Sequence, residues 1–271
     1  MKKVSKKEKL QKAIALSLVL TSVYCSPVFA EGNNNDGEDK NESAAVTDSH
    51  YTDTYSGNDG LPGGPEYTGE NGGNGGKMVV ELTGSENVSN AISFEASGGN
   101  GSEGKRQKTD SDIGYGGNGG NGGDAVLNLK ISGEAVEHQA VELAATGGNG
   151  AAAGDGAYDH KVTLTANDVL GNGGAGGRAE VGITVAAASY QAGDITLSAA
   201  GGNGADGKTT HSIDHPADKT GERVGGGGRG GSASAAGFIL TADSSSVKSV
   251  TAADVKIKET GGTGGKAPAS N

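Results

Sequence analysis

The chain is poor in the residues from which most globular proteins build a core. It has no tryptophan, three phenylalanines and only 33% apolar residues, against about 45–50% in typical soluble domains. Its single cysteine, Cys25, has no second cysteine with which to form a disulfide within the chain. These shortages argue against an ordinary globular enzyme and against a disulfide framework. Stability therefore has to come from burial and backbone pairing.

Positive charge is scarce beyond the N-terminus. The net charge is −11, and the first 30 residues hold six lysines and one glutamate, a charge of +5. The other 241 residues therefore carry −16. Binding nucleic acid through its phosphates requires a basic footprint. The composition thus predicts no nucleic-acid partner.

Residues 1–30 have the pattern of a secretory signal peptide. A lysine-rich start is followed by a short apolar run, Ala13 to Val23, and by the small residues Val28 and Ala30 at the positions that a signal peptidase reads. Eleven apolar residues are too few to span a bilayer, which takes about 20. We predict a secreted or cell-surface protein that begins at Glu31 and keeps no transmembrane span.

Glycine is abundant, at 52 of 271 residues, and it recurs at intervals. Gly-rich runs stand at 72–76, 116–123, 171–177 and 225–231. A second set, mostly Gly-Gly-Asn-Gly, stands at 98–101, 147–150, 201–204 and 261–265. Glycine and asparagine enter left-handed backbone conformations at low cost, so the second set predicts turns. The recurrence itself indicates an internal repeat.

Between the glycine runs lie four copies of one pattern, Lys77–Ser97, Asp124–Thr146, Arg178–Ala200 and Ser232–Thr260. Each copy opens and closes with alternating apolar residues, the pattern of a half-buried strand. The opening strands centre on Val80–Leu82, Leu127–Leu129, Val181–Ile183 and Phe238–Leu240. A bridge between the two strands carries one more apolar residue, Val88, Val136, Tyr190 or Val247. The closing strands align into two interior columns, Ile92, Val141, Ile195 and Val255, and Phe94, Leu143, Leu197 and Ile257.

Two strands with one buried face gain a core only when copies stack. We therefore predict an all-β protein whose residues 72–265 form a Gly-rich parallel β-solenoid, right-handed and β-helix-like, of about four irregular repeats. A sandwich of β-hairpins is the alternative fold. Residues 31–71 are acidic and poor in apolar residues, which predicts a disordered linker, and residues 266–271 form a tail. Because Gly-Gly-X has the period of polyproline II, packed polyglycine helices are a local variant for 116–123.

The strand–bridge–strand–Gly-Gly-Asn-Gly units at 77–101 and 124–150, behind a signal peptide, resemble the passenger regions of bacterial autotransporters and related adhesins. The Gly-Gly-Asn runs are similar to the repeats of the PE-PGRS surface proteins of mycobacteria. The first resemblance implies a parallel β-helix that contacts host surfaces, matrix or the cell envelope. An autotransporter ends in a membrane β-barrel, which is not seen before Asn271. The chain would then be a truncated passenger, or be retained in another way.

One segment matches a calcium-binding pattern. Residues 119–127 fit the nonapeptide in which backbone carbonyls and an aspartate chelate calcium, with Gly120, Gly122 and Asp124 as the candidate ligands. Such sites need tandem copies, because one turn supplies only part of the oxygen shell. Lys77 and Arg178 replace the aspartate in the first and third copies. The sequence therefore favours a Gly-rich turn without calcium.

Histidines and charged loops offer no firmer site. His211 and His215 flank Asp214 on a loop without a third ligand, and His138 and His160 stand alone, so all four are expected to be solvated. The cluster of Lys105, Arg106 and Lys108 is expected to be an exposed loop tip.

Three functional classes follow. The first and favoured one is a secreted or cell-surface, non-enzymatic structural or adhesive protein without a cofactor. The second is a calcium-stabilised secreted repeat protein of the kind that carries the nonapeptide. The third is a β-helix enzyme acting on polysaccharides, which would need paired carboxylates in a cleft.

Overall fold

The structure of the chain is a computed structural model that describes residues 35–65, 69–106, 116–158, 171–208, 210–212, 233–240 and 249–266. The chain divides into residues 1–32 and residues 33–271, and the fold described below is that of the second unit. The predicted signal peptide and all of the predicted tail except Lys266 lie outside the described residues.

Two parallel sheets contain most of the regular structure. The first sheet has the order β1 (Lys40–Val46), β3 (Met78–Gly84), β5 (Ala125–Ile131), β9 (Ala179–Val185) and β12 (Ala233–Leu240). The second has the order β13 (Ser249–Thr260), β10 (Ser189–Ala200), β7 (Val141–Thr146), β4 (Ile92–Ser97) and β2 (Thr52–Ser56), with β6 (Ala135–His138) also paired to β10. A separate two-stranded sheet joins β8 (Gly156–Tyr158) to β11 (Thr210–Ser212).

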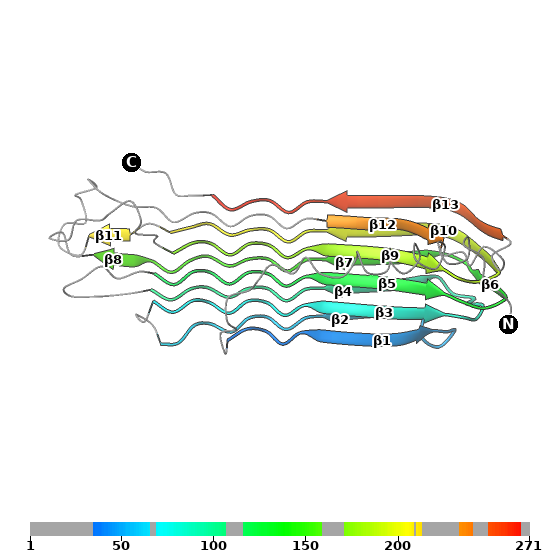
Figure 1. The fold of residues 1–271 in the computed structure, drawn as a ribbon, viewed down its shortest axis with the longest axis horizontal. Coiled ribbons are helices and arrows are strands. Elements are labelled where there is room, and N and C mark those ends of the chain that lie inside the picture. Colours follow the sequence, from blue (N-terminus) through cyan, green and yellow to red (C-terminus); the bar gives the residue numbers. More distant parts are fainter. Residues whose placement is uncertain are drawn as a thin grey trace, which may run out of the picture. The chain divides into compact units, whose positions relative to one another are not determined.

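Each repeat contributes one strand to each large sheet, so the strands of the two sheets run in opposite directions (Figure 1). Wherever these segments are described, the chain enters along a glycine-rich arm, forms a strand of the first sheet and crosses by a short connection. It then forms a strand of the second sheet and leaves along a second arm. In Figure 1 these arms run side by side away from the strands, toward β8 and β11. Each repeat whose two arms are described is thus a long, narrow loop of chain stacked on the loop before it.

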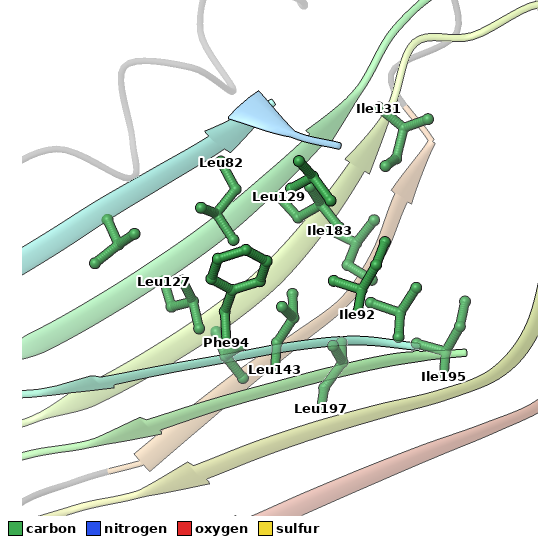
Figure 2. Close-up of a cluster of buried hydrophobic side chains, with 14 of the residues drawn as sticks. Leu82, Ile92, Phe94, Leu127, Leu129, Ile131, Leu143, Ile183, Ile195 and Leu197 are labelled. Atoms are coloured by element: carbon green, nitrogen blue, oxygen red, sulfur yellow. The ribbon is translucent and has the colours of Figure 1, made fainter. Parts of the chain in front are cut away.

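The core lies between the inward faces of the two sheets. Figure 2 shows Phe94 and Leu143 of the second sheet directed toward Leu127 and Leu129 of the first, and all four are fully buried. Burying one such side chain contributes about 1.5–3 kcal/mol. The alternation that predicted strands therefore also selected the buried faces.

The predicted columns are confirmed in their register, and their members are interior except for Val255 and Ile257, which are exposed. Ile92 pairs with Val141, which pairs with Ile195, and Phe94, Leu143 and Leu197 align in the same way. On the last strand Val255 and Ile257 take the predicted places beside Ile195 and Leu197. The bridge residues Val88, Val136 and Tyr190 are also buried, whereas Val247 lies outside the described residues.

The fourth opening strand is the exception. Its predicted alignment placed Phe238 level with Val181, but Ala235 pairs with Val181, and the register shifts before Ile239 pairs with Thr184. The strand begins several residues earlier than its bulkiest residues indicate.

The glycine-rich arms pack against each other through backbone hydrogen bonds that recur every third residue. Gly98, Gly101 and Gly104 donate N–H groups to Thr146, Asn149 and Ala152 of the next repeat. On another side of the same arm, Gly99, Ser102 and Lys105 donate to Gly76, Gly73 and Glu70. A period of three is that of the polyproline II helix. The variant that the sequence suggested for 116–123 therefore extends to both sets of arms.

Side-chain ladders connect the arms of successive repeats. The Asn100 Oδ1 atom accepts the backbone N–H of Asn149 at 2.9 Å, Asn149 does the same for Asn203, and Asn203 for Thr263. Asparagine thus recurs in the glycine runs because its amide oxygen reaches the next repeat. The expectation of left-handed turns at these motifs is wrong, since the glycines with positive φ among the described residues are Gly69, Gly133 and Gly171.

The all-β class is confirmed, but the predicted β-solenoid is wrong. A solenoid coil would turn at the Gly-Gly-Asn-Gly motifs, whereas here those motifs continue straight into the packed arms. The repeats consequently build two facing parallel sheets rather than a β-helix. The physical reason is that glycine without a Cβ lets straight backbones approach closely, and this outweighs its tendency to turn.

The predicted disordered linker, residues 31–71, is also corrected in its described part. It contains β1, which pairs with β3 from Lys40–Met78 to Val46–Gly84, and β2, which pairs with β4. Val46 is buried in the same core as the later repeats. The described acidic residues of this segment stand on exposed positions or accept hydrogen bonds, as Asp59 Oδ1 does from the N–H of Asn100 at 2.7 Å.

Candidate functional site

The ends of the arms farthest from the large sheets form the candidate site. Here the N–H of Lys105 donates to the carbonyl of Glu70 at 2.8 Å, and the N–H of Gly117 donates to the carbonyl of Lys105 at 2.9 Å. The N–H of Gly154 in turn bonds the carbonyl of Gly117 at 2.8 Å. Four arms from two successive repeats are thus fixed side by side where they end. We call this region the arm tip, residues 69–70, 103–106, 116–117, 152–158, 171, 207–208 and 210–212.

The longer insertions of the repeats depart from the arm tip. Segments 107–115 and 159–170 both begin and end there, and segment 213–232 begins there, after β11. The three segments lie outside the described residues. Strands β8 and β11 pair in register at this end, from Gly156–Thr210 to Tyr158–Ser212. The excursions of successive repeats are therefore anchored next to each other.

A depression of about 500 Å³ opens at the arm tip. Its charged lining consists of Lys105, Arg106, Lys208, Glu103 and Asp155, and its remaining walls are alanine, glycine and proline. Three cations against two carboxylates give the lining a positive balance in a chain of net charge −11. Mixed charges around a shallow depression can bind polar or anionic groups, but they do not form a closed catalytic pocket.

Sequence reasoning did not place Lys208 at the same depression as Lys105. The two residues lie in different repeats, and only the equal length of the stacked arms brings them to one surface. A signal was present, since both follow a glycine run by a similar number of residues. The cluster of Lys105 and Arg106 does end an arm, as expected for a loop tip, while Lys108 lies outside the described residues.

The candidate calcium ligands take part in the packing of the arms. The Asp124 Oδ1 atom accepts the N–H of Arg178 at 2.7 Å, and the Gly120 carbonyl accepts the N–H of Ala151 at 2.9 Å. The N–H of Gly122 donates to the carbonyl of Ala175 at 2.8 Å. Asp124 therefore belongs to the same kind of ladder as the asparagines. In the described part of the chain, no three His, Cys, Asp or Glu side chains converge on a point where a metal ion would fit.

His138 is buried, which corrects its expected place in a solvated loop. Its Nδ1 atom lies 3.2 Å from the Tyr190 hydroxyl, and its Nε2 atom lies 3.2 Å from the Glu86 carbonyl. Burial lowers the pKa of His138, against a smaller opposite effect of the Glu86 carbonyl, and burial raises the pKa of the Tyr190 phenol. The neutral imidazole fits these partners, with Nε2–H donating to the carbonyl and Nδ1 accepting from the hydroxyl.

The His138–Tyr190 pair is a structural contact within the core. The two rings meet edge to face at 5.5 Å, and Tyr190 is fully buried. Gly84 leaves room for the imidazole, because a Cβ there would lie 3.1 Å from the Cε1 atom of His138. Of the paired histidines on the predicted loop, His211 lies in β11, whereas His215 and Asp214, like His160, lie outside the described residues.

Comparison with family models, curated proteins and solved structures found no match to this chain. Among the described residues, no helix is long and apolar enough to cross a membrane.

Proposed function

We propose that the protein is a secreted or cell-surface, non-enzymatic scaffold that presents its excursions for adhesive contact with a host surface, extracellular matrix or the cell envelope. The observation that carries this proposal is the anchoring of two complete excursions, and the start of a third, at one arm tip. Loops held on a rigid framework are the usual carriers of recognition.

The arms supply the rigidity that such a display requires. Each out-going arm is bonded to the arms of neighbouring repeats at every third residue, and the asparagine ladders add side-chain bonds in the same direction. Few rotatable side chains are ordered, because most arm positions are glycine. The anchors of the excursions are therefore held in fixed relative positions, which lowers the entropic cost of binding several contacts at once.

The lysine-rich start of the chain supports export, and so does the strongly acidic remainder. Resemblance to autotransporter passengers supports the same placement outside the cell, although the β-helix that this resemblance implied is replaced by facing sheets. Mass spectrometry of the secreted and surface fractions should find an N-terminus at Glu31. Recovery of chains that still begin at Met1 would contradict export with cleavage.

Binding by the arm tip can be tested with excursion variants. Segments 107–115 and 213–223 are each replaced by a short Gly-Asn linker, which leaves the Asp206 and Lys266 ladder intact. Binding of the purified protein to cells or matrix should fall for one or both variants, while the circular dichroism spectrum stays β-rich. A matched control carries Glu134→Lys at the opposite end of the repeats, and it should bind like the parent.

A second pair of variants tests the charges of the depression. Lys105→Glu with Lys208→Glu reverses the balance of its lining, and Glu103→Lys changes it in the other direction. If the ligand is anionic, binding should decrease in the first variant and increase in the second, most clearly at low salt.

Equal binding by the proteins with trimmed excursions and by the parent protein would mean that the excursions are spacers, and the adhesive proposal would fail.

A further inference from the structure

The last strand of the second sheet leaves apolar side chains exposed. Val255 is 41% and Ile257 49% exposed, whereas the residues beside them in the same columns, Ile195 and Leu197, are completely buried. Strand β13 pairs over its whole length with β10 on one side. Its other edge has no partner among the described strands. Such a long edge with apolar inward residues is a template for pairing with another chain.

Charged residues close the other end of the stack, at the first repeat, which contains β1 and β2. Lys40 and Glu42 stand level with the buried residues Met78 and Val80, and Asp53 stands level with Phe94. The ring of His50 covers Phe94 edge-on at 5.4 Å. Charged residues at inward positions prevent an edge from accepting another strand. The two ends therefore differ, and a head-to-tail stack would place Asp53 in the column of Ile257.

We propose that β13 docks on β13 of a second copy about a two-fold axis, so that the second sheet continues from one chain into the other. A two-fold interface makes the two strands antiparallel and pairs the same surface with itself. The exposed valine and isoleucine would then be covered by their own counterparts, which removes the exposed patch from water.

The charges of β13 select one register. When Val255 lies opposite Ile257 of the second copy, Asp254 lies opposite Lys258 and Lys256 lies on the axis. In this register each Val255 covers the Ile257 of the other copy, so the apolar contact forms twice. Two pairs of opposite charge also form, and each is favourable across a sheet. The Asp254 carboxylate, which already lies 3.3 Å from Lys256 Nζ, also offsets the meeting of the two Lys256 side chains. Moving the register by two residues in one direction leaves Ile257 opposite Ala253, and in the other it places Lys256 opposite Lys258.

The dimer would point its two arm tips in opposite directions. The arm 261–266 continues directly from β13, and antiparallel strands send these arms away from each other. One assembly would thus present a tip at each end and could connect two surfaces. Two tips in one particle raise the effective concentration for the second contact.

Sedimentation equilibrium of the purified protein over a range of concentrations tests this pairing. We expect a mass of two chains for the parent and of one chain for Ile257→Asp, which alters a half-exposed side chain. Asp254→Lys and Lys258→Asp each set like charges opposite each other, and each should raise the dissociation constant about tenfold. The double variant Asp254→Lys with Lys258→Asp restores opposite charges and should return the dissociation constant to within about threefold of the parent.

Three results would overturn the proposal. The first is a parent protein that sediments as a single chain at every concentration. The second is a series of larger species, which indicates head-to-tail stacking. The third is a double variant whose dissociation constant is as high as those of the two single variants, which shows that these charges do not face each other. Thermal unfolding of each variant as a diluted monomer serves as the control, and the midpoints should agree with that of the parent chain.

Discussion

Single inward-facing residues carry the packing between the two sheets. Leu143 lies at the centre of a column with Phe94 on one side and Leu197 on the other, and it is completely buried. Its neighbour Glu142 points to the opposite face of the sheet and is exposed. Adjacent residues of this strand thus face the core and the solvent alternately, so substitutions at the two positions test the register directly.

Leu143→Asp should destabilise the protein far more than Glu142→Lys. A buried charge without a partner costs about 3–5 kcal/mol, whereas exposed substitutions usually stay within about 0.5 kcal/mol. The urea midpoints of the two variants are the measurement. Equal shifts of both midpoints would contradict the assigned faces.

His138 makes stability depend on pH. Its folded pKa lies below the ordinary value of 6.5 because burial penalises the imidazolium. The unfolded chain therefore binds the extra proton first, and the free energy of unfolding decreases as the pH falls from about 6.5 to the folded pKa. Protonation would also turn Nδ1 from an acceptor into a donor, so that the Tyr190 hydroxyl would have to accept this hydrogen bond instead of donating it.

His138→Gln should remove this loss of stability on acidification. The measurement is chemical unfolding at several pH values between 5 and 8, which gives the difference in the free energy of unfolding between parent and variant at each pH. His50 provides the contrast, because the Ala45 carbonyl and Asp53 raise its pKa, so that its contribution is present below about 6.5 and is lost as the pH rises. His50→Gln should therefore change the curve in the opposite sense. Parallel curves for parent and His138→Gln would contradict the assignment.

Among the elements, the arms depend most on glycine. The backbone of Gly120 passes so close to the carbonyl of Gly73 that a Cβ on Gly120 would lie closer than 3.0 Å to its oxygen. The Gly120 N–H donates to the Ser102 carbonyl at 2.9 Å, and its own carbonyl accepts from Ala151. Glycine is required here by the approach of three backbones rather than by a turn.

Gly120→Ala should therefore destabilise the protein by about 1–3 kcal/mol, the usual cost of overpacking. Ala152→Ser is the matched control, because this arm position already holds a side chain. Thermal unfolding of both variants is the measurement. A stable Gly120→Ala variant would show that the arms separate easily.

At the scale of the whole molecule, the repeats stack through their backbones. Strands of the large sheets pair with strands of neighbouring repeats, and each described arm also bonds the other arm of its own repeat, as Gly99 bonds Gly76. The first repeat closes one end with charges, and the last leaves an apolar edge at the other. Stability and assembly of the protein thus depend on what happens at its two terminal repeats.

Hydrogen exchange should show the arms to be as protected as the strands. The N–H of Gly123 bonds the Gly99 carbonyl at 2.8 Å, and that of Gly148 bonds the Gly123 carbonyl at 2.9 Å, with all three glycines buried. These amides should exchange slowly, and the exposed connection 85–87 should exchange quickly. Fast exchange at Gly123 and Gly148 would contradict packed arms.

Much of the fold can be predicted from the sequence, because period-two alternation depends only on which residues avoid water. That pattern predicted the strands and the alignment of Ile92 with Val141 and of Phe94 with Leu143. The all-β class follows from the same signal. The positions of the repeats also follow, since each glycine run marks where an arm begins or ends.

Only the tertiary structure decided what the glycine runs do. A Gly-Gly-Asn-Gly motif can turn or run straight, and the choice depends on whether other backbones are available to bond it, as Gly148 is bonded by Gly123. The same holds for β1 and β2, whose polar residues pair only because a finished repeat offers an edge. Lys105 and Lys208 line one depression because separate repeats stack, and His138 is buried against Tyr190, 52 residues further along the chain. Local sequence determines which residues prefer the interior, because that preference depends on each side chain alone. The packing of the arms and terminal strands depends on contacts between backbones that are distant in the sequence, so only the tertiary structure shows it.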